Sequence, residues 1–174
     1  MFSSHYEATV APDIVRVVLN IGCNKINMNI LDTAGLERFG ALASNYMRKA
    51  DAVLLCFDVT NLKSFEHIEY WKNEFTVGTN PMDPPNYPFF LVSTKIDLQN
   101  QVVKQEMIKR WLSGNNKIPY FETSAKNDIS VNELFNCIAK ELACREATQP
   151  KEKIARPEPV ILEPIGNGRK TGCC

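Results

Sequence analysis

The run from Ala52 to Val59 (AVLLCFDV) constrains the fold most, because it is apolar at successive positions. A strand with one face in water alternates apolar and polar residues, whereas a strand of a parallel sheet covered on both faces is apolar throughout. Residues 89–92, extending to Thr94, have the same character, and PYFE at 119–122 is a shorter example. Together with the helical patterns between them, these runs predict an α/β domain with a mainly parallel sheet.

Amphipathic stripes predict the helices that cover this sheet. Apolar side chains recur at steps of three and four, in the sets Phe65, Ile68, Trp71 and Phe75; Val103, Met107 and Trp111; and Val131, Leu134, Phe135, Ile138 and Leu142. Ser130 and Glu133 predict a capping box at the start of the last helix. Upstream, residues 14–21 and 26–31 predict two strands of a hairpin, joined by a turn at residues 22–25.

Length and charge limit the classes of protein to which the chain can belong. Its 174 residues suit one domain, with residues 1–147 as the folded part and the proline-rich residues 148–174 as a flexible tail. The 20 basic and 20 acidic residues balance, which argues against an electrostatic nucleic-acid binder. No apolar run approaches the ~18 residues of a membrane span, and no secretory signal is evident. The irregularly spaced cysteines favour a reduced, cytosolic compartment.

Three short motifs each follow a predicted strand. Asp32-Thr33-Ala34-Gly35 offers a carboxylate for Mg²⁺ and a glycine N–H that can approach a phosphate, although an ordinary Asx-turn has the same residues. Thr94-Lys95-Ile96-Asp97 offers a carboxylate for guanine's N1–H and exocyclic amine, and a lysine stem to cover the ring. Glu122-Thr123-Ser124-Ala125-Lys126 offers backbone N–H groups to guanine O6. Alone, either of these two could be a loop without a ligand.

The order of these motifs resembles the Ras superfamily. DTAGLERF, TKIDL and YFETSAK stand at the spacing of its switch and guanine-recognition motifs, and the chain ends in paired cysteines as Rab proteins do. The stretches WKNEF, DPPNYPF and IPYFETSAK are most similar to the late-endosomal Rab branch. The resemblance implies a Ras-like G domain that binds GTP or GDP with Mg²⁺ and acts in endosomal vesicle traffic.

The resemblance also implies roles for individual residues. Thr9 and Asp32 would hold Mg²⁺, and the Gly35 N–H would contact the γ-phosphate. The guanine site would consist of Thr94, Lys95, Asp97, Ser124, Ala125 and Lys126. Effectors would meet the switch face formed by Leu36, Phe39, Leu42 and Tyr46, side chains that could equally pack onto the sheet. Thr9 could equally be a threonine in a disordered N-terminus.

Several features depart from the family pattern. The phosphate-loop motif G-x-x-x-x-G-K-[ST] does not occur in the sequence, and the family's first strand and helix lie upstream of the residues matched here. We therefore expect the strands at 26–31 and 52–59 to lack a shared neighbour, and nucleotide binding to be weaker than micromolar. Leu36 stands where the family has the glutamine that orients the attacking water, so hydrolysis should be lost. Thr94 replaces an asparagine that braces the base.

The terminal Cys173 and Cys174 predict geranylgeranylation after a proline-rich spacer, and two lipid chains give stable anchoring. Exposed thiols without function, or a redox pair, are the alternatives. The implied partners are Rab escort protein with the prenyltransferase, GDP-dissociation inhibitor, effectors and endosomal or other vesicle membranes, with a cytosolic pool.

Two other hypotheses stay open: a nucleotide-independent interaction module and a truncated, non-functional product. Whether the chain is an enzyme stays open with them.

Overall fold

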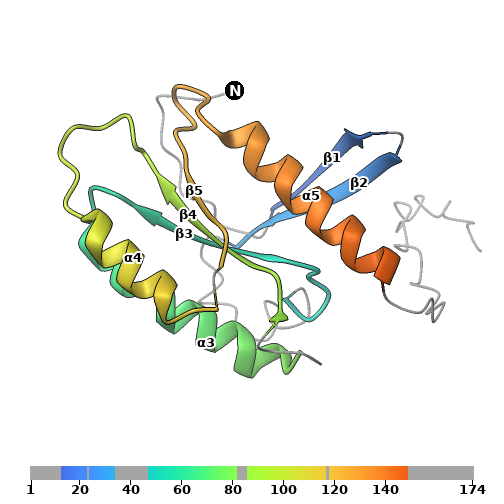
Figure 1. Ribbon diagram of the computed structural model, residues 1–174, viewed down its shortest axis with the longest axis horizontal. Coiled ribbons are helices and arrows are strands. Elements are labelled where there is room, and N and C mark those ends of the chain that lie inside the picture. Colours follow the sequence, from blue (N-terminus) through green and yellow to red (C-terminus); the bar gives the residue numbers. More distant parts are fainter. Residues whose placement is uncertain (1–12, 23, 34–46, 82–85, 117, 149–174) are drawn as a thin grey trace, which may run out of the picture.

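The computed structural model describes residues 13–22, 24–33, 47–81, 86–116 and 118–148. Strands alternate with helices along these residues, and helices lie on both sides of the central sheet (Figure 1). The elements are β1 (Asp13–Ile21), β2 (Asn24–Asp32), β3 (Val53–Asp58), α2 (Leu62–Glu66), α3 (Ile68–Thr79), β4 (Phe89–Thr94), α4 (Gln105–Ser113), β5 (Tyr120–Glu122) and α5 (Val131–Thr148). The predicted α/β class is confirmed.

Strand β4 is the centre of a parallel sheet with the order β3-β4-β5. In the register, Leu91 of β4 lies opposite Leu55 of β3 on one side and opposite Tyr120 of β5 on the other. All of β4 from Phe89 to Ser93 is buried, and only Thr94 at its end is partly open. This burial explains the continuous apolar sequence of β4, because both of its faces are covered.

The two faces of this sheet pack against different helices. Leu55, Phe57, Phe89 and Leu91 share one core with residues of α2, α3 and α4, including Phe75 and Ile108. Phe90 and Val92, which alternate with them along β4, pack on the other face against Leu134 and Ile138 of α5. Figure 1 shows α3 and α4 on one side of the sheet and α5 on the other. The side-chain alternation of a strand therefore divides the core in two.

Strands β1 and β2 form a separate antiparallel hairpin, in register from Asp13 opposite Asp32 to Ile21 opposite Asn24. Gly22 follows β1 with a φ of 59°, a conformation that glycine adopts without steric cost. Within the described residues no backbone pairing joins β2 to β3, as we expected from the sequence. Met28 of β2 packs instead beside Leu54 on the α5 side of the sheet.

Details at the helix starts differ from the sequence prediction. Ser130, expected to cap α5 with its side chain, has a φ of 56°, which is not the extended conformation of a capping box. Its carbonyl accepts the Leu134 N–H at 3.1 Å, which begins the backbone hydrogen bonding of the helix. Val103 is buried but lies ahead of α4, and the first stripe is divided between α2 and α3 at His67. Among the helices described here, none is long and apolar enough to cross a bilayer.

Replacing Leu91 with alanine should test the core beneath the sheet. Leu91 is 0% exposed, so Leu91→Ala removes buried methyl groups and leaves a cavity, at a cost of about 2–5 kcal/mol in the free energy of unfolding. Urea unfolding followed by tryptophan fluorescence measures this cost. Val77 is 82% exposed on α3 and is the matched control. A Leu91→Ala variant as stable as Val77→Ala would contradict the described core.

Candidate functional site

The carboxyl ends of three parallel strands meet at one edge of the sheet. β3 ends at Asp58, β4 at Thr94 and β5 at Glu122, in the register that pairs Asp58 with Thr94 and Ser93 with Glu122. Ligands of open α/β sheets bind at this edge. The two motifs predicted to recognise guanine, residues 94–97 and 122–126, therefore lie next to each other although Asp97 and Ser124 are 27 residues apart along the chain.

Buried backbone contacts lock these two loops together. Thr123 donates to the Ser93 carbonyl twice, from its N–H and from Oγ1, each at 2.8 Å. The Ile96 N–H in turn donates to the Thr123 carbonyl at 3.3 Å. Ser93 and Thr123 are both buried, so these bonds form away from water and fix the loop after β4 against the loop after β5.

Asp97 and Ser124 are in direct contact. The fully buried Ser124 donates its Oγ–H to Asp97 Oδ1 at 2.6 Å, and Ser124 Oγ accepts the Asn127 N–H at 3.1 Å. Asp97 itself is half-buried. This contact fixes one oxygen of the Asp97 carboxylate against the loop after β5. The structure thus brings together two of the residues that the sequence predicted.

The turn after β5 presents Ala125 and Lys126. Ser124 and Ile129 form a closed bridge, with Ser124 N–H to Ile129 O at 3.2 Å and Ile129 N–H to Ser124 O at 2.9 Å. Ala125 and Lys126 are exposed in the turn that this bridge closes. Both residues follow Ser124, whose side chain contacts Asp97, and the role of their backbone N–H groups stays a prediction.

Thr94 contacts the sheet itself. Its Oγ1 donates to the Phe57 carbonyl of β3 at 3.0 Å, and its own carbonyl accepts the Val59 N–H at 3.3 Å. Both bonds join β4 to β3. The Thr94 hydroxyl therefore helps to hold two strands together.

Asp58, at the end of β3, also belongs to this edge, although no sequence motif pointed to it. Lys95 Nζ lies 2.6 Å from Asp58 Oδ2, and the other carboxylate oxygen of Asp58 accepts the N–H and Oγ1–H of Thr60 at 2.8 and 2.6 Å. Partial desolvation acts to raise the pKa of Asp58, but the hydrogen bonds from Lys95 and Thr60 outweigh it and hold the pKa below its ordinary value of 3.8. The signal was present as an acidic residue ending an otherwise apolar strand.

Asp32 ends β2, where the sequence placed a Mg²⁺ ligand. Cys56 of β3 is its neighbour. Although Cys56 has exposed surface, desolvation, followed by the charge of Asp32, raises the pKa of its thiol to about 11. No cluster of three metal-ligating residues exists in the described part of the chain. Mg²⁺ usually takes one or two protein carboxylates and completes its shell with water and phosphate oxygens, so Asp32 fits such a site.

The remaining predicted residues lie outside the described ranges. These are the second Mg²⁺ candidate, the phosphate contact, the switch face and the lipidation site, namely Thr9, Gly35, Leu36, Phe39, Leu42, Tyr46, Cys173 and Cys174. Their roles stay predictions.

Comparison with known proteins identifies the family of the chain. Residues 1–144 match the family model described as the Ras family. The chain belongs to the Ras family. It is 39% identical to the Ras-related protein Rab-7a of Dictyostelium discoideum over 176 residues, and 38% identical to the GTP-binding protein yptV5 of Volvox carteri over 175 residues; in each case the alignment covers 99% of this chain and 84% of the relative. The predicted membership of the Rab group, on the Rab7 side, is confirmed.

Removing the Lys95 ammonium from this Ras-family chain should raise the pKa of Asp58. Lys95→Met removes the hydrogen bond that most strongly lowers the Asp58 pKa, so this pKa moves up toward 3.8 or beyond. A lowered folded-state pKa means that ionised Asp58 adds stability above pH 3.8, which disappears as the pH falls through the folded-state pKa. Lys95→Met should therefore have a lower free energy of unfolding at neutral pH. Below pH 3.8 its free energy of unfolding should depend less on pH than that of the unchanged protein.

Side-chain carboxyl NMR over a pH titration measures the Asp58 pKa directly. Lys72→Met is the control, because Lys72 contacts Glu69 and Asn115 on another face. An Asp58 pKa that is the same in Lys95→Met and in the unchanged protein would show that the pair does not form.

Proposed function

We propose that this Rab-family chain binds guanine nucleotide through the loops after β4 and β5 and acts in endosomal vesicle traffic, with GTP hydrolysis lost. The observation that carries the proposal is the contact of Asp97 with Ser124, at 2.6 Å, beside Lys95 and the turn at Ala125 and Lys126. These residues come from two loops and converge at the edge of the sheet where ligands of this fold class bind.

The chemistry of the site matches guanine better than adenine. An ionised carboxylate accepts hydrogen bonds and donates none, and guanine offers two adjacent donors, N1–H and the exocyclic amine. Ser124 fixes one Asp97 oxygen and so orients the carboxylate for that pair. Adenine has an acceptor at N1 where guanine has a donor, so the same carboxylate would repel it. Backbone N–H groups of Ala125 and Lys126 would donate hydrogen bonds to guanine O6.

The phosphate side of the proposal rests on family membership. Mg²⁺ would neutralise charge on the nucleotide's phosphates when bound, and Asp32, with Thr9, would hold it; the Gly35 N–H would meet the γ-phosphate. Leu36 has no hydrogen-bonding group with which to orient water, so bound GTP should remain intact. Overall affinity should be weaker than micromolar, because the sequence does not contain the phosphate-loop motif.

Exchanging Asp97 for asparagine should change which base the protein prefers. In Asp97→Asn the side-chain amide would donate a hydrogen bond where the carboxylate accepts one. The change removes a charge-assisted hydrogen bond to guanine's exocyclic amine. It also allows a neutral hydrogen bond to the carbonyl that xanthine has at the same position. Losing a hydrogen bond to a charged group costs about 1.5–3 kcal/mol, so guanosine nucleotide should bind at least about tenfold more weakly. NMR titration of the backbone amides with GTP, XTP and ATP in Mg²⁺ measures all three affinities, and the recovered nucleotide shows whether GTP was hydrolysed.

Asp128→Asn is the matched control, since Asp128 lies in the same exposed turn, whereas the hydrogen bonds of Ser124 Oγ are made with Asp97 and Asn127. Equal affinities for GTP and ATP in the unchanged protein would reject guanine recognition. The absence of shifts with all three nucleotides would favour a nucleotide-independent interaction module. Release of phosphate from GTP would reject only the loss of hydrolysis.

The tail supports the membrane part of the proposal. Cys173 and Cys174 form a paired-cysteine ending that Rab escort protein and a prenyltransferase would modify, and GDP-dissociation inhibitor would then extract the lipidated protein into a cytosolic pool. Effectors would meet the switch face. The chain would thus reside on the cytosolic face of endosomal or other vesicle membranes.

Changing both terminal cysteines to serine should release the protein from membranes. Each geranylgeranyl chain contributes about 0.8 kcal/mol per buried CH₂, and the tail has little other affinity for lipid, so anchoring should be lost. Fractionation of cells that express Cys173→Ser/Cys174→Ser measures it. Cys137→Ser/Cys144→Ser on α5 is the control. Unchanged membrane association of the tail variant would count against prenylation.

A further inference from the structure

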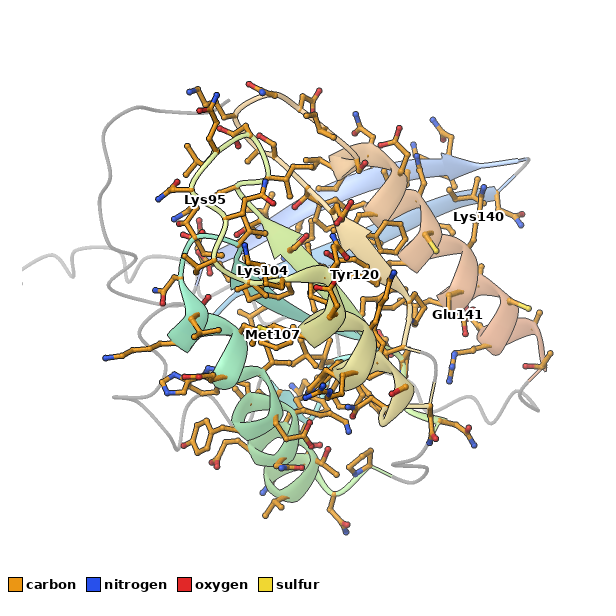
Figure 2. All side chains as sticks on the ribbon, turned by 60° about the vertical axis from the view of Figure 1, so that its left-hand side comes forward. Lys95, Lys104, Met107, Tyr120, Lys140 and Glu141 are labelled. Atoms are coloured by element: carbon orange, nitrogen blue, oxygen red, sulfur yellow. The ribbon has the colours of Figure 1, made fainter. Side chains whose placement is uncertain are left out.

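We propose that Asp58 is a positioning residue for guanine recognition, whose carboxylate holds the Lys95 ammonium so that the lysine stem forms a fixed platform for the base. This inference rests on the proposed function. It adds a residue from β3 to a site otherwise formed by the loops after β4 and β5. Figure 2 shows Lys95 among the loops at this edge of the sheet, away from Glu141 on α5.

Lys95 is held at both ends. Its backbone has a φ of 60°, in the left-handed region, and its carbonyl accepts the Leu98 N–H at 3.0 Å. Its Nζ lies 2.6 Å from Asp58 Oδ2. The side chain between these two points is 60% exposed, so its methylene groups are available to a ligand. A lysine stem with both ends fixed presents an apolar surface in one orientation, which a free surface lysine does not.

Asp58 is itself rigidly placed. Its side chain is only 18% exposed, and its Oδ1 accepts two hydrogen bonds from Thr60, which leaves Oδ2 for the ammonium. Its backbone N–H donates to Ser64 Oγ at 3.0 Å, and its place at the end of β3 pairs it with Thr94. The ammonium is thus attached to the sheet, one strand away from the backbone that carries it.

The ligand that the geometry favours is a flat base next to Asp97. Asp97 follows Lys95 by two residues, so the platform and the base-selecting carboxylate belong to one loop, which the buried contacts of Thr123 hold in place. Because Asp58 orders the long Lys95 side chain before the ligand binds, binding no longer includes the entropy cost of ordering that side chain. Losing this preorganisation should weaken guanosine nucleotide binding by between about twofold and tenfold.

Asp58→Asn tests the role, because asparagine can still accept from Thr60 but has no charge to hold the ammonium. We expect guanosine nucleotide to bind about two- to tenfold more weakly. The variant should also lose the stability that ionised Asp58 adds at neutral pH. In a Lys95→Met background the same substitution should have no further effect, since the two residues act as one unit. Glu141→Gln, which breaks the Glu141–Arg145 pair on α5, is the matched control and should leave affinity unchanged.

A second measurement does not depend on nucleotide. Trace acylation with acetic anhydride, followed by mass spectrometry, should label Lys95 faster in Asp58→Asn, whereas Lys104 and Lys140 should be labelled at unchanged rates. Unchanged labelling of Lys95, or an Asp58→Asn effect that persists in Lys95→Met, would overturn the inference. If the unchanged protein binds no guanosine nucleotide, the proposed function fails and the base-platform role fails with it, while labelling still decides whether Asp58 holds Lys95.

Discussion

The pairing of β4 with a parallel strand on each side is the constraint on which the other features depend. It buries Phe90 against α5 and Leu91 against the opposite helices, and it aligns the ends of three strands at one edge. Every described residue of the proposed guanine site lies at the end of one of these strands or in the loop that follows β4 or β5. A shift of one residue in the register would move Asp58 away from Lys95 and Thr123 away from the Ser93 carbonyl.

The site combines a dry interior with a charged surface. Hydroxyl groups of Thr123 and Ser124 form buried hydrogen bonds beneath the loops, while Lys95 and Lys126 remain exposed above them. Buried hydroxyls act at fixed distances because water does not compete for them. The exposed charges then take a defined position without being buried themselves, which avoids the desolvation cost of a buried ion. Loops that are fixed in this way suit the recognition of a flat, polar ligand.

Much of this could be predicted from residue patterns. The uninterrupted apolar runs at 52–59 and 89–92 indicated buried parallel strands, and the motifs at 94–97 and 122–126 indicated loops that would meet. The partner of Asp58 could not be found in this way, because Lys95 lies 37 residues away and becomes a neighbour only through the parallel register. The contact of Thr94 with the Phe57 carbonyl is invisible for the same reason. The capping box at Ser130 failed because the bridge between Ser124 and Ile129 brings the chain into α5 with a left-handed residue at its start.

The hairpin of β1 and β2 has a different relation to the rest of the protein. In the described part of the chain it touches the parallel sheet through side chains such as Met28, and no ladder of backbone hydrogen bonds connects the two. A two-stranded hairpin is marginally stable alone. The protein should therefore open in two steps, with the hairpin amides exchanging with solvent at a lower free energy than those of β4. The position of Asp32, which ends β2 and which we propose as a Mg²⁺ ligand, would then depend on the less stable unit.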